Sequence, residues 1–332
     1  MGDQPTWEWD LPVGWAPPEV PADNPMSEAK VELGRRLFYD PTLSADGTLS
    51  CSSCHEQARA FTDGRALSPG IDGSVGHRSA QPLANVGYLR PLTWANPLIG
   101  SLEEQALLPL FGESPVELGL AGREAQLEDR LRDDAAYVRA FAEAFPDDDA
   151  PVRWPRVLQA LAAFQRTLVS GDSPYDRFLA GDRDALSDQA ERGLSLFESE
   201  RLGCVGCHSG PTLAGHGFHH TGLYDEDGSG SYPVPNRGVF EITFDDADMG
   251  RFRAASLRNV AVTAPYMHDG SIDTLDGVLD HYAAGGRAAS ARTSPRLTGF
   301  SLSDDERSAL LAFLESLTDD RFLEDPRFSD PR

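Results

Sequence analysis

Two copies of the pattern C-x-x-C-H constrain this chain more than any other feature of its sequence. CSSCH occupies residues 51–55 and CVGCH occupies 204–208, and together they contain all four cysteines. A disulfide framework is disfavoured, because a bridge within either pair would close only a very small loop. Two thiols three positions apart, followed at once by His, match covalent attachment of haem c. The thiols bond to the porphyrin edge, and the His ligates the iron from one side.

Other sites also use part of this pattern. The C-x-x-C segment alone suits a redox-active dithiol or half of a zinc site. Two complete copies with no cysteine left over favour haem, so we expect two haem c groups. The expected attachment residues and proximal iron ligands are Cys51, Cys54, His55, Cys204, Cys207 and His208.

The expected haem c groups also predict where the protein is located. Covalent haem c is assembled outside the cytoplasm, which predicts a periplasmic or otherwise exported protein. No secretory signal opens the chain, and MGDQPTWEWDLP reads as an initiator methionine placed on a mature sequence.

Each cluster follows a similar helical segment. SEAKVELGRRLF starts at Ser27 and SDQAERGLSLF starts at Ser187, each with a serine N-cap and apolar residues at four-residue steps. Both contain G-x-x-L-F, at Gly34–Phe38 and at Gly193–Phe197. The repeat predicts a duplicated domain.

The remaining periodic segments are also helical. They are 154–171, 274–286 and 303–317, the last opening with a capping box of Ser303 and Glu306. No sustained strand alternation is visible, so the predicted fold class is mainly α. We expect an extended arm over 1–26, an N-terminal domain over 27–185 and a C-terminal domain over 186–332. Residues 209–250 lack periodicity and are expected to form a long functional loop.

Charge limits the partners. The formal net charge of −24 argues against nucleic acid and anionic membranes, and suits a basic protein partner. No apolar run is long enough to cross a bilayer.

The residue opposite the second iron decides whether it passes electrons or binds peroxide. The side chains considered for this position are Met249, Met267, His268, His281 and Tyr282. In TLDGVLDHY the apolar face is Leu275, Val278, Leu279 and Tyr282. His281 is expected to point about 100° away, toward solvent. Tyr282 is therefore the inward residue, although an ordinary core tyrosine would show the same period.

Longer blocks carry a family resemblance. SLRNV followed by APYMHDGSIDTLDGVLDHY, both haem-type clusters and SLEEQALLPLFGESPVELG resemble the bacterial dihaem cytochrome c peroxidase and MauG superfamily. The resemblance implies two fused cytochrome c-like domains, each with one haem c, and a calcium ion between the haems. DLPVGWAPPEVPADNP, AFTDG, PLANVGY and LTWANP are similar to MbnH-type enzymes, which use peroxide to oxidise a tryptophan of the partner protein MbnP to kynurenine.

The resemblance also implies residue roles. Tyr282 matches the axial Tyr of MauG, and Trp94 matches the tryptophan placed between the haems. Gln105 and Glu117 match the distal residues over the first, peroxide-binding haem, where Glu117 is suited to move a proton between peroxide oxygens. Trp94 could instead be an ordinary packed aromatic residue, and Glu117 a solvated acid in a loop. Glu113 remains a possible substitute for Glu117 as the distal acid.

The sequence departs from the family pattern at several positions. The calcium-binding Asn is matched by Ser79, whereas Thr263 and Pro265 match the other calcium positions. His77 does not align with the switchable distal His of the peroxidases, so an open first haem is expected. Leu202 stands where MauG has a surface Trp used for hopping, which argues against the MauG substrate.

The implied function is peroxide-dependent oxidation of a tryptophan on an MbnP-like, copper-binding partner to kynurenine, through a high-valent two-haem state. The rival is a cytochrome c peroxidase that reduces hydrogen peroxide with electrons from a small redox protein. A dihaem electron carrier is a third interpretation. A separate metal site at His216, His219 and His220 is disfavoured, because FHHTG matches a family loop.

Overall fold

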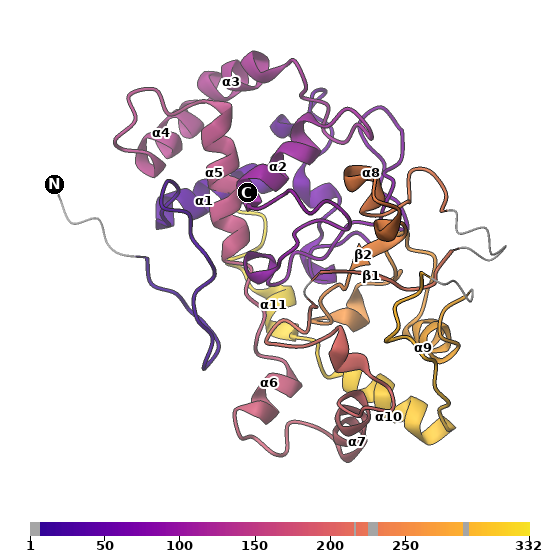
Figure 1. Cartoon of the computed structure of the whole chain (residues 1–332). Helices are drawn as coiled ribbons and strands as arrows, with labels where there is room; N and C mark the ends of the chain where they lie inside the picture. Colours follow the sequence, from indigo (N-terminus) through magenta and orange to yellow (C-terminus); the bar gives the residue numbers. More distant parts are fainter. Residues whose placement is uncertain (1–6, 216, 225–231, 288–291) are drawn as a thin grey trace.

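The chain is mainly helical, as predicted (Figure 1). The computed structural model describes residues 7–215, 217–224, 232–287 and 292–332. The α-helices are α1 (Glu28–Tyr39), α2 (Leu102–Phe111), α3 (Glu124–Asp133), α4 (Ala135–Ala144), α5 (Trp154–Arg166), α6 (Pro174–Leu179), α7 (Asp188–Phe197), α8 (Phe240–Thr243), α9 (Leu275–Ala283), α10 (Asp304–Glu315) and α11 (Asp320–Glu324). Short 3₁₀ helices are η1 (Pro41–Leu43), η2 (Cys51–Ser53), η3 (Gln57–Arg59), η4 (Val86–Tyr88), η5 (Cys204–Gly206), η6 (Asp246–Asp248) and η7 (Val260–Val262). Strands β1 (Phe218–His220) and β2 (Arg251–Arg253) pair antiparallel, with His219 opposite Phe252.

One helix pair occurs twice. α1 packs on α5 in the upper part of Figure 1, and α7 packs on α10 in the lower part. A Cβ atom at Gly34 would lie 1.9 Å from the Ala160 carbonyl oxygen, and one at Gly193 would lie 2.0 Å from that of Ala309. The glycine of each G-x-x-L-F motif therefore lets two helix backbones approach closely, in the same way in both halves.

A second equivalence lies in PLANV and SLRNV. Asn85 and Asn259 share the left-handed conformation, with φ 61° and ψ 21° in both. The Asn85 amide donates to the Leu168 carbonyl at 2.7 Å, after α5, and the Asn259 amide donates to that of Leu317 at 3.0 Å, after α10. These two segments therefore occupy corresponding places in the two halves.

The apolar side chains form two main clusters. The first extends from Leu33 to Leu168 and recruits Phe322 and Phe328 from the C-terminal end. The second begins at Tyr175, so α6 packs with the second half although the sequence assigned it to the first. The domain limits at residues 26 and 185 stay predictions.

The N-terminal arm lies along the first half without helical structure from residue 7 to 26. Trp15 meets Tyr88 edge to face, with ring centroids 5.2 Å apart. Residues 1–6 of the predicted arm lie outside the described residues.

The predicted helix starts are confirmed, and some of the predicted ends are too late. Ser27 accepts from the Lys30 amide, and Ser303 and Glu306 form the expected capping box. α5 ends at Arg166 and α9 at Ala283, each before the predicted end. The 209–250 segment contains β1, α8 and η6, which are too short to give a period; its residues 216 and 225–231 lie outside the described part.

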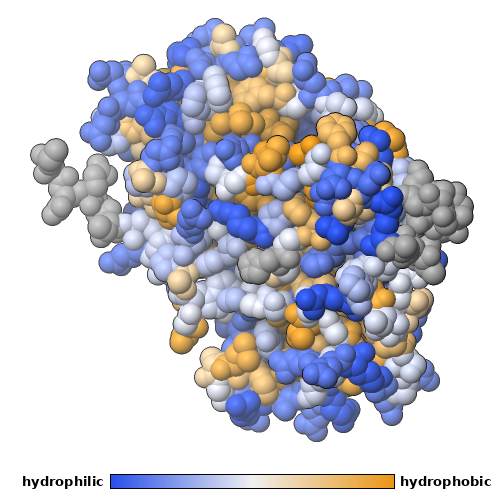
Figure 2. Space-filling model, in the orientation of Figure 1, coloured by the Kyte–Doolittle hydropathy of each residue, from blue (hydrophilic) through white to orange (hydrophobic). Residues whose placement is uncertain are grey.

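The surface agrees with the acidic composition. The face in Figure 2 is mostly hydrophilic, with apolar side chains gathered in smaller areas between. In the part of the chain that the structure describes, no helix has the length and apolar character needed to cross a membrane.

Candidate functional site

The second C-x-x-C-H cluster lies on the wall of an internal cavity of about 230 Å³. Gly203, at φ +68°, leads into η5, and Cys204, Cys207 and His208 then face this cavity. His208 donates from Nδ1 to the Leu213 carbonyl at 3.2 Å, which leaves Nε2 as the free acceptor nitrogen. A second-shell bond of this kind fixes the tautomer of a metal-ligating imidazole.

α9 forms another part of the cavity wall. Thr274 caps the helix by accepting from the Gly277 amide at 3.1 Å. The four residues of the predicted apolar face, Leu275, Val278, Leu279 and Tyr282, all line the cavity. Burial, with smaller contributions from the nearby Cys207 and Cys204, raises the pKa of Tyr282 to about 12. The ligand role of Tyr282 stays a prediction.

The expectation for His281 was wrong. This side chain is 6% exposed rather than directed to solvent, and its Nε2 donates to the Thr221 carbonyl at 2.9 Å. α9 is covered on this side by the segment that follows β1, which had no period by which the sequence could place it.

The other candidate ligands divide by position. Met267 and His268 line the cavity, whereas Met249 packs beside the separate small cluster of Ala95, Tyr232, Val239 and Phe252. His268 stacks on Phe252 with centroids 3.5 Å apart, and burial lowers its pKa to about 3, so the imidazole is neutral.

Trp94 reaches the same cavity from the first half of the chain. Its indole Nε1 donates to the Ser79 carbonyl at 2.9 Å, and its own carbonyl accepts from the Arg253 amide at 3.0 Å. The Arg253 guanidinium lies 5.8 Å from the indole centroid. Trp94 is therefore held by residues of both halves. Its predicted place between the two haems stays a prediction.

The first cluster has its own proximal histidine. Cys51–Ser53 form η2, and His55 donates from Nδ1 to the Phe61 carbonyl at 2.6 Å. With Nδ1 donating, Nε2 is the acceptor nitrogen of the neutral ring, and burial lowers the pKa of His55. Phe61 lies at φ +65°, in the left-handed region, as part of the turn that brings its carbonyl to the imidazole.

Acidic residues follow α2. Glu117 is exposed at the surface, desolvation nevertheless raises its pKa, and its charge is felt by both Cys51 and Cys54. Glu113 is exposed as well, and Glu117 is the carboxylate whose charge acts on the first thiol pair. Gln105 lies half-buried within α2, whose capping box of Ser101 and Glu104 fixes the helix start.

The thiols do not resemble a redox pair. Burial raises the pKa of Cys51 to about 12, and that of Cys54 and Cys204 to about 11. Redox-active C-x-x-C motifs lower a thiol pKa instead. Among the described residues, no group of three or more His, Cys, Asp or Glu side chains is placed to hold a metal ion.

Comparison with known proteins decides the family. The family model for di-haem cytochrome c peroxidase matches residues 28–184. Cytochrome-c peroxidase IdrP1 of Denitromonas iodatirespirans is 38% identical, over 95% of this chain and 89% of that protein. Methylamine utilization protein MauG of Methylophilus methylotrophus is 36% identical, over 90% and 85%.

This chain belongs to the dihaem cytochrome c peroxidase and MauG family. It is a peroxide-dependent dihaem oxidoreductase. A crystal structure of a MauG-like protein associated with microbial copper homeostasis matches with a TM-score of 0.95 and 48% identity, over 98% of this chain and 99% of that one.

The family implies two haem c groups, and the cavity at the second cluster fits one. Its wall is largely apolar, as the porphyrin requires. Arg253 is 6% exposed and His268 4%, and Arg253 Nε and His268 Nε2 have no hydrogen-bond partner among the described residues. Burial also lowers the pKa of Arg253 to about 10. An unpaired guanidinium N–H and an unpaired imidazole nitrogen, which donates when it carries the ring proton, suit the carboxylates that a haem carries.

The predicted calcium positions share one cavity. Ser79, Thr263 and Pro265 all line the same cavity. The Ser79 hydroxyl donates to the Met267 carbonyl at 3.1 Å, and that of Thr263 donates to the Val260 carbonyl at 3.1 Å. Calcium takes six to eight oxygens, so these positions would need further carbonyls or water, and the ion stays a proposal.

Two other expectations concern histidines. His219 and His220 lie in β1, and His216 lies outside the described residues. His77, the non-aligned histidine, is half-buried in the loop before Ser79.

The sequence did not single out Arg253, Ser256 or Arg258. Arg258 is 2% exposed and pairs with Asp176 at 2.5 Å. A comparison of SLRNV with PLANV would have pointed to Arg258 as a residue of interest, because the first half has Ala84 at the corresponding position.

Proposed function

We propose that this enzyme uses hydrogen peroxide to oxidise a tryptophan of a partner protein to kynurenine. The observation that carries the proposal is Tyr282, whose phenol faces the cavity of the second cluster from the same wall as the apolar face of α9. A phenol oxygen stabilises oxidised iron, whereas a thioether raises the reduction potential. This suits a site that retains oxidising equivalents.

The proposed partner is an MbnP-like copper-binding protein. The support is the 48% identity to a MauG-like protein whose crystal structure is described as associated with microbial copper homeostasis. The net charge of −24 favours a partner with a basic docking surface. Assembly of covalent haem c outside the cytoplasm supports an exported location for both proteins.

The reaction balances with peroxide as the only oxidant. Two peroxide molecules convert one tryptophan to N-formylkynurenine and are reduced to two waters. Hydrolysis then releases formate and leaves kynurenine. When bound, the two haems would supply the iron at which peroxide is reduced and the path for the electrons.

The residues of the chain have separate tasks in this scheme. His55 and His208 would hold the irons through Nε2, each oriented by a carbonyl. The Glu117 carboxyl would take a proton from one peroxide oxygen and return it to the other, with Gln105 beside it. Trp94 would carry electrons between the halves, because it is fixed to both.

The rival function is reduction of peroxide with electrons from a small redox protein, as the names of several relatives state. A decisive experiment adds peroxide to the ferric dihaem enzyme in two reactions. One contains a purified MbnP-like protein, and the other contains a reduced small cytochrome. Mass spectrometry should find kynurenine on the partner, with little oxidation of the cytochrome. Fast cytochrome turnover with an unmodified partner would establish the rival.

Tyr282→Phe tests the observation behind the proposal. It removes one oxygen from the cavity wall and keeps the ring. We expect the variant to lose partner oxidation. Full kynurenine formation by this variant would contradict the proposed role of the phenol.

A further inference from the structure

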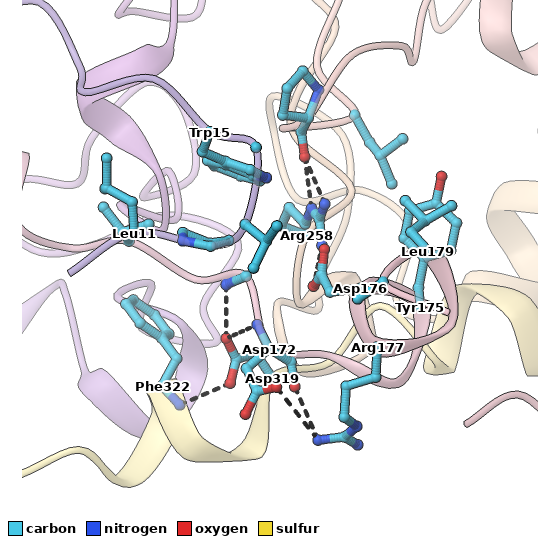
Figure 3. A pocket seen from close by; sticks show the side chains of 18 of the residues that line it. Leu11, Trp15, Asp172, Tyr175, Asp176, Arg177, Leu179, Arg258, Asp319 and Phe322 are labelled. Carbon is cyan, nitrogen blue, oxygen red and sulfur yellow. Dashed lines mark hydrogen bonds and ion pairs between the residues drawn. The ribbon is translucent and has the colours of Figure 1, made fainter. Parts of the chain in front are cut away.

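Arg258 fixes the loop that follows the second cluster (Figure 3). Its Nε and Nη2 donate to the Pro211 carbonyl at 2.8 and 2.7 Å, and its Nη1 pairs with Asp176 at 2.5 Å. The guanidinium also lies 5.5 Å from the ring of Trp15 and 5.6 Å from that of Tyr175. This one side chain therefore joins the N-terminal arm, α6 and the loop behind the second proximal histidine.

The two residues before Arg258 hold the next two carbonyls of the same loop. Ser256 Oγ donates to the Thr212 carbonyl at 2.6 Å, and the Leu257 amide donates to the Leu213 carbonyl at 3.3 Å. That Leu213 oxygen is also the acceptor for His208 Nδ1, at 3.2 Å. The second imidazole thus shares its acceptor with a backbone amide.

The first cluster is arranged differently. His55 Nδ1 lies 2.6 Å from the Phe61 carbonyl. The amide of Leu83, which corresponds to Leu257, donates instead to the preceding carbonyl, that of Ala60, at 3.2 Å. The first imidazole therefore does not share its acceptor with the corresponding amide, and its bond is 0.6 Å shorter (3.2 less 2.6 Å).

The sequence difference between the repeats explains this asymmetry. PLAN at 82–85 corresponds to SLRN at 256–259. The side chains of Pro82 and Ala84 carry no donor, whereas the side chains of Ser256 and Arg258 both donate to the loop. The two extra bonds draw the 211–213 carbonyls toward residues 256–258.

We propose that Ser256 and Arg258 are positioning residues that keep the Leu213 carbonyl away from His208, so that the two proximal imidazoles donate unequally to their irons. A short Nδ1–H bond gives an imidazole more negative character and makes it a stronger ligand. His55 is then the stronger donor, which favours the oxidised forms at the first haem. His208 is then the weaker donor. The second haem is therefore easier to reduce than it would be with a proximal imidazole as strong as His55.

The inference rests on the two haems that family membership implies, and not on tryptophan oxidation. Ser256→Ala removes one donor from a small side chain. Arg258→Lys keeps a cation for Asp176 but removes the two-nitrogen contact with Pro211. The measurement is the reduction potential of each haem by spectroelectrochemical titration of the dihaem protein. Both variants should lower the potential of the second haem and leave the first unchanged.

Matched controls separate this effect from general loosening. Ser316→Ala removes a hydroxyl bond of the same length, 2.6 Å to the Phe313 carbonyl, and Arg166→Lys alters a buried arginine paired with Glu103 at 2.8 Å. Neither control should move the second potential. An unchanged or raised second potential in either test variant, or an equal shift in a control, would overturn the proposal. Loss of kynurenine formation alone would not bear on it.

Discussion

Trp94 and Ser79 are joined by a hydrogen bond of 2.9 Å from the indole Nε1 to the Ser79 carbonyl. The Ser79 amide in turn donates to the His268 carbonyl at 2.8 Å. One residue thus connects the indole to the second half of the chain, while the Arg253 amide holds the Trp94 carbonyl from the other side. The ring position is therefore fixed by backbone groups of both halves.

Trp94→Phe should impair partner oxidation. The phenyl ring lacks the N–H that bonds Ser79, so both the orientation and the indole are lost. We expect the rate of kynurenine formation to fall roughly tenfold or more, measured by mass spectrometry of the partner over time. Trp154→Phe is the control, because Trp154 packs edge to face on Phe111 outside the candidate site. Equal rates for the two variants would exclude a bridging role.

Glu117→Gln should slow the reaction with peroxide itself. The amide keeps the shape of the side chain but cannot accept and return a proton. We expect a loss of about 10²- to 10⁴-fold in the rate of reaction with peroxide, followed by stopped-flow absorbance of the haems. Glu113→Gln removes an exposed carboxylate four residues earlier and should be close to wild type. The reverse order of effects would assign the proton transfer to Glu113.

The pH dependence of the peroxide reaction gives an independent check on Glu117. Desolvation raises the pKa of this carboxyl above its ordinary value of 4.5. A carboxylate that accepts a proton works only when ionised, so the rate should rise with pH through this raised pKa. The midpoint of this rise in rate should lie above pH 4.5 in the wild-type enzyme. The rise should be absent in Glu117→Gln. A midpoint at or below 4.5 would show that the ionisation of Glu117 does not control the rate of the peroxide reaction.

Local patterns in the sequence predicted the positions of several residues of this site. The C-x-x-C-H spacing placed each thiol pair beside its histidine, because five consecutive residues leave little freedom. The period of α9 placed Tyr282 on the cavity wall for a similar reason, since one helix turn fixes which residues share a face. Capping residues marked the helix starts at Ser27 and Ser303.

Tertiary packing decided the rest. His281 was expected in solvent because periodicity describes one helix alone, and the segment at Thr221 that covers it has no period. The roles of Ser256 and Arg258 depend on three carbonyls more than 40 positions away. α6 joined the second core although its sequence is polar and turn-rich, because Tyr175 packs edge to face on Phe313.

The repeated helix pair predicts two matched effects on stability. Gly34→Ala and Gly193→Ala would each place a methyl group about 2 Å from a backbone carbonyl oxygen of the partner helix. Overpacking of this kind costs about 1–3 kcal/mol of unfolding free energy. Gly100→Ala is the control, since the nearest atom to its methyl group would be a Glu104 carboxylate oxygen at 3.5 Å. Urea unfolding should give both helix variants a clearly lower unfolding free energy than the control. An unchanged unfolding free energy in either helix variant would contradict the close contact.

Lys30 predicts how stability depends on pH. It is the only lysine of the chain and is 5% exposed. Its Nζ donates to Asn24 Oδ1 at 3.0 Å and to the Pro25 carbonyl. Burial lowers the pKa of Lys30 from 10.5 to about 8, and Arg156 and Arg166 act in the same direction, against Glu103.

The sign of the effect follows from proton binding. Below pH 8 the lysine is charged in both folded and unfolded chains, so the cost of burying the charge is fully present. Between 8 and 10.5 the unfolded chain keeps a proton that the folded chain has lost. The unfolding free energy should therefore rise with pH across this window, by up to about 3 kcal/mol.

Lys30→Met isolates this contribution. Urea unfolding of wild type and variant across the window should show a rise in wild type only, because methionine has no proton to lose. Tyrosines buried elsewhere, such as Tyr39 with a pKa raised to about 12, act in the opposite direction at higher pH and affect both proteins equally. The difference between the two curves therefore reports Lys30 alone. Parallel curves would mean that Lys30 keeps an ordinary pKa in the folded protein.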